Sequence, residues 1–488
     1  MRTFLSLLVF AFGLFGCQLT DSQAQSTRSA STNAHVQVVE SLMSLPEQGP
    51  TSAPGHHKTN ATVQANVHHV KMAVDPQYRR LLFSAEQVVN VRLRLQAADV
   101  GSTERPPLEL ALVLDTSGSM SGNKLRDAKA AAMSLISGLD TRDRVTLIAY
   151  ASHVHRVANR VIMDDAGRRR LTQHILGLKA GGSTALGPAL VDAAHVLGQA
   201  SGSSLMLRHV ILMSDGVANV GESRPDILAM RARQAFRDGI SLSTMGVGLD
   251  YNEDLMTKIA NMGGGRYHFI EDSAKIAAVL KDEFQGLVAT IARDVHVAIK
   301  PTPGVRLVKV HGYPVHATEY GSSIQIGCMG RRQTREVMMQ FIIAQGLSPA
   351  KDEFLAQFTL TYADIVRDAR TMRHDAQLRV GLATTLEQQR QSENTDVTIR
   401  LAEVESSAQL EIAARSVSAG NYGEARRVMN HAIQKLKREH RATPSPKLTE
   451  QLHLFEAAAG DMVASEQSAA ARKRVAKKYK ARAYQKSK

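Results

Sequence analysis

The stretch that decides the fold reads Leu108-Glu109-Leu110-Ala111-Leu112-Val113-Leu114, and Asp115-Thr116-Ser117-Gly118-Ser119 follows it directly. The first seven residues are almost continuously apolar, which is typical of a strand buried on both faces of a parallel sheet. Binding groups gather at the carboxyl ends of such strands. The following loop therefore presents the side-chain oxygens of Asp115, Ser117 and Ser119 at one edge of the sheet.

Working outward from this strand, strands and helices alternate as far as Phe284. Apolar side chains at helical spacing predict helices over 124–139, 166–176, 185–197, 224–236 and 253–261. Short apolar runs predict strands over 144–150, 154–158, 209–213, 240–247 and 267–270. The alternation predicts an α/β domain over 108–284, with a doubly wound, mainly parallel sheet and helices on both faces.

The flanks of this domain have a different pattern. Alternating apolar residues predict β structure over 61–107 and again over 285–370. We expect the two β regions to pair into one β-sandwich-like region, with the α/β domain inserted between them. Residues 371–470 are predicted to be helical, including one hairpin formed by helices over 409–418 and 424–439. A chain of 488 residues is long enough for about three such domains.

The N-terminus reads as an export signal. Arg2 precedes an apolar run over 3–15, which is too short to span a bilayer comfortably and ends just before Cys17. This resembles a bacterial lipoprotein signal, which implies a signal peptide over 1–16, lipid on Cys17 and a flexible tether over 17–60. A plain secretory signal is the alternative. The expected location is the cell envelope, and Gln18 after the cysteine favours the outer membrane.

Charge is concentrated at the other end of the chain. The formal net charge is +14, and nine basic residues without an acidic one lie in 471–488. The rest is only mildly basic, so a nucleic-acid partner is not expected. The basic tail is predicted either to dock on an anionic envelope polymer or lipid, or to be solvated. Cys328 is the only cysteine besides Cys17, so we expect no disulfide within the chain once Cys17 carries lipid.

Three segments, in order, carry a resemblance to a known family. Val113 to Leu125 resembles the opening of von Willebrand factor type A domains, Ala180 to Leu186 resembles their second metal loop, and Val210 to Gly216 their third. More narrowly, the chain is similar to the branch that contains calcium-activated chloride channel regulators and exported bacterial type A proteins. The resemblance implies a metal site formed by Asp115, Ser117, Ser119, Thr184 and Asp215. Ser183 neighbours Thr184 and is able to take its place in register.

Oxygen ligands of this kind suit Mg²⁺, and Mn²⁺ or Ca²⁺ are alternatives. The resemblance implies protein recognition, in which one open coordination position accepts an Asp or Glu side chain of an unidentified protein partner. We expect no enzymatic activity, because zinc-protease, nucleophile-elbow and phosphate-loop motifs are all absent from the sequence. The alternatives are an accessory subunit of a channel, transport or envelope complex, and a metal-assisted hydrolase.

Overall fold

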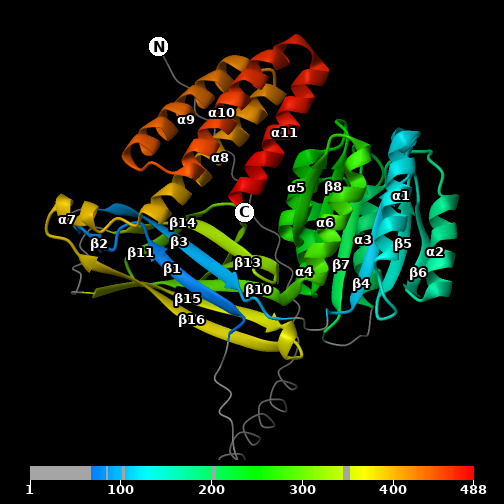
Figure 1. The fold of residues 1–488 in the computed structure, drawn as a ribbon, viewed down its shortest axis with the longest axis horizontal. Helices are drawn as coiled ribbons and strands as arrows, with labels where there is room; N and C mark the ends of the chain where they lie inside the picture. The colour runs from blue at the N-terminus through cyan, green and yellow to red at the C-terminus, as the bar shows by residue number, and fades with distance from the viewer. Residues whose placement is uncertain (1–67, 84–85, 102–104, 200–204, 345–351) are drawn as a thin grey trace, which may run out of the picture. The chain divides into compact units, whose positions relative to one another are not determined.

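The computed structural model describes residues 68–83, 86–101, 105–199, 205–344 and 352–488. Cys17, the predicted signal and tether, and the start of the predicted β region at 61–67 lie outside these residues. The described chain contains a parallel α/β domain, a β-sandwich built from segments on both sides of it, and a C-terminal helical region (Figure 1). The predicted fold class is therefore confirmed.

Six strands form the sheet of the α/β domain. In the spatial order β6-β5-β4-β7-β8-β9, they are Val154–Ile162, Arg144–Tyr150, Leu108–Asp115, Leu207–Ser214, Ile240–Val247 and Gly264–Ile270. Strand β4 pairs in parallel with β5 and β7, and only the edge strand β6 is antiparallel to its neighbour. Because β4 is central, the loop that follows it lies between the loops of its neighbours.

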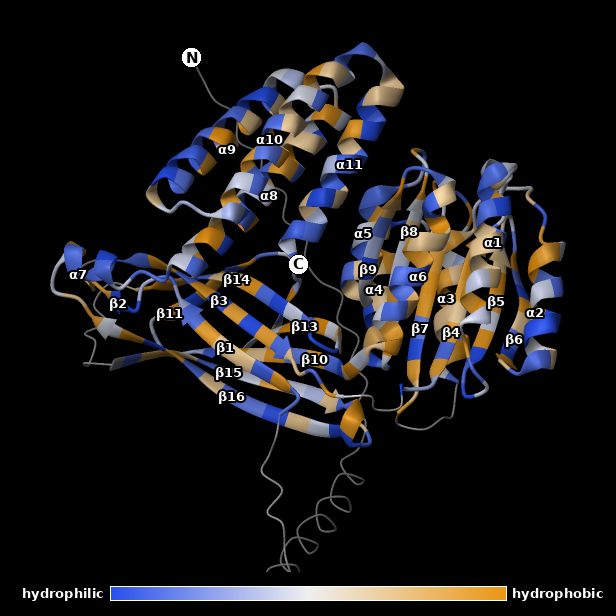
Figure 2. Ribbon diagram, viewed as in Figure 1, coloured by the Kyte–Doolittle hydropathy of each residue, from blue (hydrophilic) through white to orange (hydrophobic). Residues whose placement is uncertain are grey.

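Helices cover both faces of this sheet. One face carries α1 (Asn123–Ser137), α2 (Asp165–Gly177) and α6 (Ile276–Val288), and the other carries α3 (Leu186–Gly198), α4 (Pro225–Arg237) and α5 (Glu253–Met262). Strand β4 contributes alternate side chains to the two cores: Leu112 packs under α1, whereas Val113 packs under α3. Figure 2 shows β4 and β7 as hydrophobic strands, which agrees with burial on both faces.

The sandwich joins segments from both sides of the α/β domain. One sheet contains β1 (Val70–Pro76), β3 (Gln87–Ala97), β14 (Thr334–Ile343) and β11 (Val305–Val310), in that order. The other contains β12 (Val315–Thr318), β13 (Gly321–Gly330), β10 (Thr290–Pro301), β15 (Asp352–Asp364), β16 (Arg370–Leu382) and β2 (Arg80–Leu81). Strand β3 precedes the α/β domain in the sequence and β14 follows it, yet the two strands pair with each other. The predicted insertion is thus present.

Strand β16 lies where the sequence predicted the start of the helical region at residue 371. Its side chains are mostly polar and exposed, and Met372, Leu378 and Val380 are its buried hydrophobic residues. Such a sparse apolar pattern does not distinguish a strand from a helix. Pairing along the full length of β15 stabilises it as a strand, because neighbouring backbones satisfy each other's hydrogen bonds.

The helical region is larger than the predicted hairpin. After the short α7 (Leu386–Gln391) come α8 (Thr395–Ser418), α9 (Tyr422–Ala442), α10 (Pro446–Ala464) and α11 (Ala469–Ser487). The predicted hairpin corresponds to α8 and α9, and the two further helices share its apolar core. None of the helices in the described ranges combines the length and the apolar composition that crossing a bilayer requires.

Nearly all of the basic tail lies in α11, which packs against α8 and β9. Six of its nine basic side chains contact acidic side chains or a carbonyl of the same chain: Lys473, Arg474, Lys477, Lys478, Lys480 and Lys486. Lys477 is buried, and its ammonium donates to the carbonyl of Tyr251 at 2.9 Å. The tail is therefore a helix whose charges are partly paired within the chain, and whether it also docks on an anionic envelope polymer or lipid stays a prediction.

The packing of α10 gives a direct test of the helical core. Phe455 is fully buried, whereas Val463 on the same helix is half exposed. Phe455→Ala is expected to lower the free energy of unfolding of this region by about 3–5 kcal/mol, because it removes apolar contacts and leaves a cavity. Val463→Ala is the control, with an expected change of less than about 0.5 kcal/mol. Urea unfolding followed by circular dichroism measures both, and equal losses would contradict the described packing.

Candidate metal centre

Three loops meet at the carboxyl edge of the parallel sheet. Asp115 ends β4, Asp215 follows β7, and Thr184 precedes α3. Backbone hydrogen bonds join the loop after β4 to the loop before α3: the amide of Gly118 donates to the carbonyl of Gly182 at 3.0 Å, and the amide of Gly181 donates to the carbonyl of Thr116 at 2.8 Å. These two loops are therefore held together by main-chain atoms, independently of their side chains.

Asp115 is completely buried at the centre of this edge. One carboxylate oxygen accepts from the amide of Ser117 and the other from the hydroxyl of Ser214, both at 2.8 Å. Burial raises the pKa of Asp115 above its usual value, although the hydrogen bonds from Ser117 and Ser214 lower it. Among the described ion pairs, no basic side chain pairs with Asp115. A buried carboxylate without a cationic partner is costly, and a metal ion would supply the missing positive charge.

The hydroxyl groups lie beside the two carboxylates. The Oγ atoms of Ser117 and Ser119 are 3.1 Å apart, and the Ser119 hydroxyl donates to Asp215 Oδ1 at 2.6 Å. Two adjacent ligands of an octahedral Mg²⁺ ion lie about 3.0 Å apart when each is about 2.1 Å from the metal. The spacing of the two serine hydroxyls fits one edge of such an octahedron.

The hydroxyls of Thr184 and Ser119 both lie beside Gly216. A Cβ atom placed on Gly216 would lie 3.2 Å from Thr184 Oγ1 and 3.4 Å from Ser119 Oγ, so both hydroxyls flank this glycine. The amide of Thr184 donates to Asn219 Oδ1 at 2.8 Å, which anchors the second loop to the third. The structure thus brings all five predicted ligands together, and it is Thr184, the predicted ligand, whose hydroxyl lies against Gly216.

Sequence reasoning missed two residues of this centre, Ser214 and Lys124. Ser214 holds Asp115, as described above, and the ammonium of Lys124 lies 2.6 Å from Asp215 Oδ2. Lys124 belongs to the first turn of α1, shortly after the first metal loop, and the sequence pattern indicated only a helical position. Its separation from Asp215 by 91 residues hides the pair from any local pattern.

The chemistry of the donor set fits a hard divalent cation. The described residues contain no cluster of three or more His, Cys, Asp or Glu side chains suited to a metal ion. A metal at the sheet edge would instead rest on two carboxylates and three hydroxyls. Oxygen ligands of this kind select Mg²⁺, Mn²⁺ or Ca²⁺ over softer metals.

Comparisons with known proteins agree with the fold of the α/β domain. Residues 109–282 match the family model of the von Willebrand factor type A domain. The chain is 31% identical over 222 residues to the uncharacterized protein YfbK of Escherichia coli, in a match that covers 45% of this chain and 38% of YfbK. It is 27% identical over 192 residues to inter-alpha-trypsin inhibitor heavy chain H4 of Sus scrofa, which covers 38% of this chain and 21% of the inhibitor chain. These matches span well under half of each relative.

A solved structure extends the likeness to the flanks. The von Willebrand factor type A protein from Catenulispora acidiphila superposes with a TM-score of 0.65 and 18% identity, and the match covers 82% of this chain and 90% of that protein. At this identity the likeness concerns the fold alone, but it includes more than the α/β domain.

Residues 109–282 therefore form a von Willebrand factor type A domain. Domains of this family are typically protein-interaction modules, are often metal-dependent and are mostly non-enzymatic.

Gly216 allows a test of the site that leaves every predicted ligand in place. Gly216→Ala inserts a methyl group against the hydroxyls of Thr184 and Ser119, and it is expected to weaken Mn²⁺ binding by about tenfold, because metal ligation tolerates only small displacements. Gly181→Ala is the matched control, since no atom lies within 4 Å of the added Cβ. Calorimetric titration with Mn²⁺ measures both affinities. Equal affinities for the two variants would contradict the assigned ligand positions.

Proposed function

We propose that this protein captures a protein partner through a divalent metal, Mg²⁺ in the first place, held by Asp115, Ser117, Ser119, Thr184 and Asp215. The observation that carries the proposal is Asp115, a fully buried carboxylate with no basic partner among the described ion pairs, surrounded by hydroxyls at ligand spacing. Ser119 is exposed, so the centre opens to the surface on the side of the first loop. A partner is therefore able to reach it.

Each residue has a distinct part in this proposal. The three hydroxyls would supply neutral oxygen ligands, and the carboxylates of Asp115 and Asp215 would balance most of the charge of the ion. Ser214 keeps Asp115 from turning, and the hydrogen bond from Ser119 orients Asp215. The bound metal would supply an electrophilic position for a carboxylate. An Asp or Glu side chain of the partner is the expected occupant, since carboxylate oxygens suit these cations.

The cellular setting is part of the proposal. Lipid on Cys17 would hold the protein in the bacterial cell envelope, with the outer membrane favoured, and the tether would let the metal centre reach partners there. A role as an accessory subunit of a channel, transport or envelope complex is compatible with the same metal-dependent contact. The pairing of the basic side chains of α11 within the chain reduces the positive charge available for an envelope polymer.

Removal of the central ligand tests the proposal. Asp115→Ala and EDTA are each expected to abolish capture of partner proteins from envelope extracts, because both remove the metal. Asp226→Ala is the matched control, since this carboxylate is highly exposed and pairs only with Lys258 among the described residues. Partner recovery is measured by pull-down and mass spectrometry. Equal recovery of partners with and without EDTA would contradict the metal-dependent mechanism.

Lys124 provides a second test, in which two affinities change in opposite directions. Two carboxylates and one ammonium leave the site with one net negative charge, and a divalent ion would turn this into one net positive charge. Lys124→Met is expected to tighten Mn²⁺ binding by about tenfold, because a competing cation is lost, and to weaken partner capture at saturating Mn²⁺.

Lys129→Met, on the next turn of α1, is the control for this experiment. Its ammonium donates to the carbonyl of Leu176 and not to a metal loop. Calorimetry with Mn²⁺ and pull-down at saturating Mn²⁺ give the two measurements. If Lys124 only supported the loop structurally, its loss would weaken both, which is the result that contradicts the electrostatic role.

A further inference from the structure

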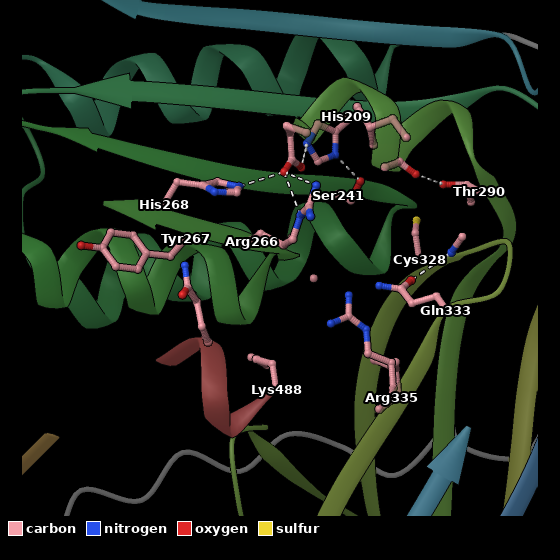
Figure 3. Close-up of a pocket in the computed structure, with 18 of the residues that line it drawn as sticks. His209, Ser241, Arg266, Tyr267, His268, Thr290, Cys328, Gln333, Arg335 and Lys488 are labelled. Atoms are coloured by element: carbon pink, nitrogen blue, oxygen red, sulfur yellow. Dashed lines mark hydrogen bonds and ion pairs between the residues drawn. The ribbon is translucent and has the colours of Figure 1, made fainter. Parts of the chain in front are cut away.

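A polar cavity lies at the edge of the parallel sheet opposite the metal loops. His209 and Ser241, near the starts of β7 and β8, form one wall, and Asp215 lies beyond the other end of β7. The cavity has a volume of about 250 Å³ and lies between β9 and α6 of the α/β domain, β13 and β14 of the sandwich, and the last turn of α11 (Figure 3).

Glu283 is the only acidic residue among those that line this cavity, and it is already engaged. Its carboxylate accepts from the hydroxyl of Ser243 at 2.6 Å, from Nε of Arg266 at 2.8 Å and from Nε2 of His268 at 2.9 Å. Burial raises the pKa of Glu283, but the close contact of His209 Nε2 at 3.4 Å, the hydrogen bond from His268 and the charge of Arg266 outweigh it and hold the pKa well below its usual value. This carboxylate is therefore neutralised by its own neighbours.

The opposite wall carries positive charge that no carboxylate side chain of the described residues pairs with. Arg335 on β14 directs its guanidinium into the cavity, and its buried Nε has no hydrogen-bond partner (Figure 3). Among the described residues, no carboxylate pairs with Arg335 or with Lys488. The ammonium of Lys488 lies 4.0 Å from the ring centroid of Tyr313. The Tyr313 hydroxyl is also buried without a partner.

These two cations affect each other. Burial, and then the charge of Arg335, lower the pKa of Lys488 to about 7. Desolvated charges of like sign destabilise one another, and a buried cation is normally paired with an anion. Water could fill the space, since polar cavities of this size hold it, but water neutralises no charge. The wall thus has three hydrogen-bond donor groups, and among the described residues no carboxylate side chain pairs with any of them.

We propose that this cavity binds a small oxyanion, either free phosphate or the carboxylate of a small organic acid, between Arg335, Lys488 and the hydroxyl of Tyr313. The planar guanidinium presents paired N–H groups that match two oxygens of such an ion, which a spherical halide cannot use in the same way. The bound anion would also connect three parts of the chain. Its ligands come from the sandwich and from the end of α11, and Arg266 of the α/β domain lines the same cavity.

Equilibrium dialysis of the full chain against radiolabelled inorganic phosphate tests the proposal, at an ionic strength held constant with sodium chloride. The wild type is expected to bind phosphate at one saturable site. Arg335→Gln is expected to weaken this binding by at least about tenfold, since a charge-assisted, bidentate contact is lost. Arg332→Gln is the matched control: it lies on the same segment, but its side chain is highly exposed and pairs with Asp99, so its affinity is expected to stay within about twofold of the wild type.

A milder variant guards against loss of folding in Arg335→Gln. Tyr313→Phe removes one hydroxyl and keeps the buried ring, and it is expected to weaken phosphate binding by about threefold or more. Displacement of phosphate by acetate, with chloride constant, would assign the site to carboxylates as well, and lack of displacement would assign it to phosphate. No saturable uptake by the wild type, or equal uptake by wild type, Arg335→Gln and Tyr313→Phe, would overturn the proposal. None of these outcomes depends on the metal centre, because phosphate binding is measured in EDTA.

Discussion

A carboxylate buried at the end of the central strand is the constraint on which the functional edge of this protein depends. Asp115 is held on one oxygen by the amide of Ser117 and on the other by the hydroxyl of Ser214, so it cannot turn toward solvent. Such a buried anion needs a cation. The parallel sheet brings oxygen ligands for such a cation to one place, because the ends of β4 and β7 and the start of α3 meet at the same edge.

At the other edge of the sheet, the charge that lacks a partner of opposite sign is positive. There Glu283 accepts hydrogen bonds from β8 and β9, whereas among the described residues no carboxylate side chain pairs with Arg335 or Lys488. One edge of the sheet therefore offers buried negative charge, and the other offers positive charge next to the sandwich. Because a sheet separates them, ligands of opposite charge are able to bind at the two edges without competing for the same side chains.

Helix α11 connects these parts through charge and packing. Its early basic residues reach Asp250 and Glu271 near the metal-bearing edge, and its last turn reaches the cavity beside Tyr313. Pairs at the surface contribute little individually. The buried contact of Lys477 with the carbonyl and ring of Tyr251 is stronger support, since both groups are shielded from water. A segment that reads as an isolated basic tail is thus part of the folded core of the molecule.

The α/β domain, its insertion into β structure and the set of five candidate ligands were all predicted from the sequence. The domain and its first loop follow from local patterns, because continuous apolar runs indicate buried strands and the residues directly after such a strand lie at the sheet edge. The full set of five ligands is what the resemblance to von Willebrand factor type A domains implies. The tertiary structure decided the strand β16, the pairing of α11, and the positions of Lys124 and Arg335. The physical reason is that charge pairing depends on distance in space, and residues 91 positions apart, such as Lys124 and Asp215, leave no trace of their contact in a local pattern.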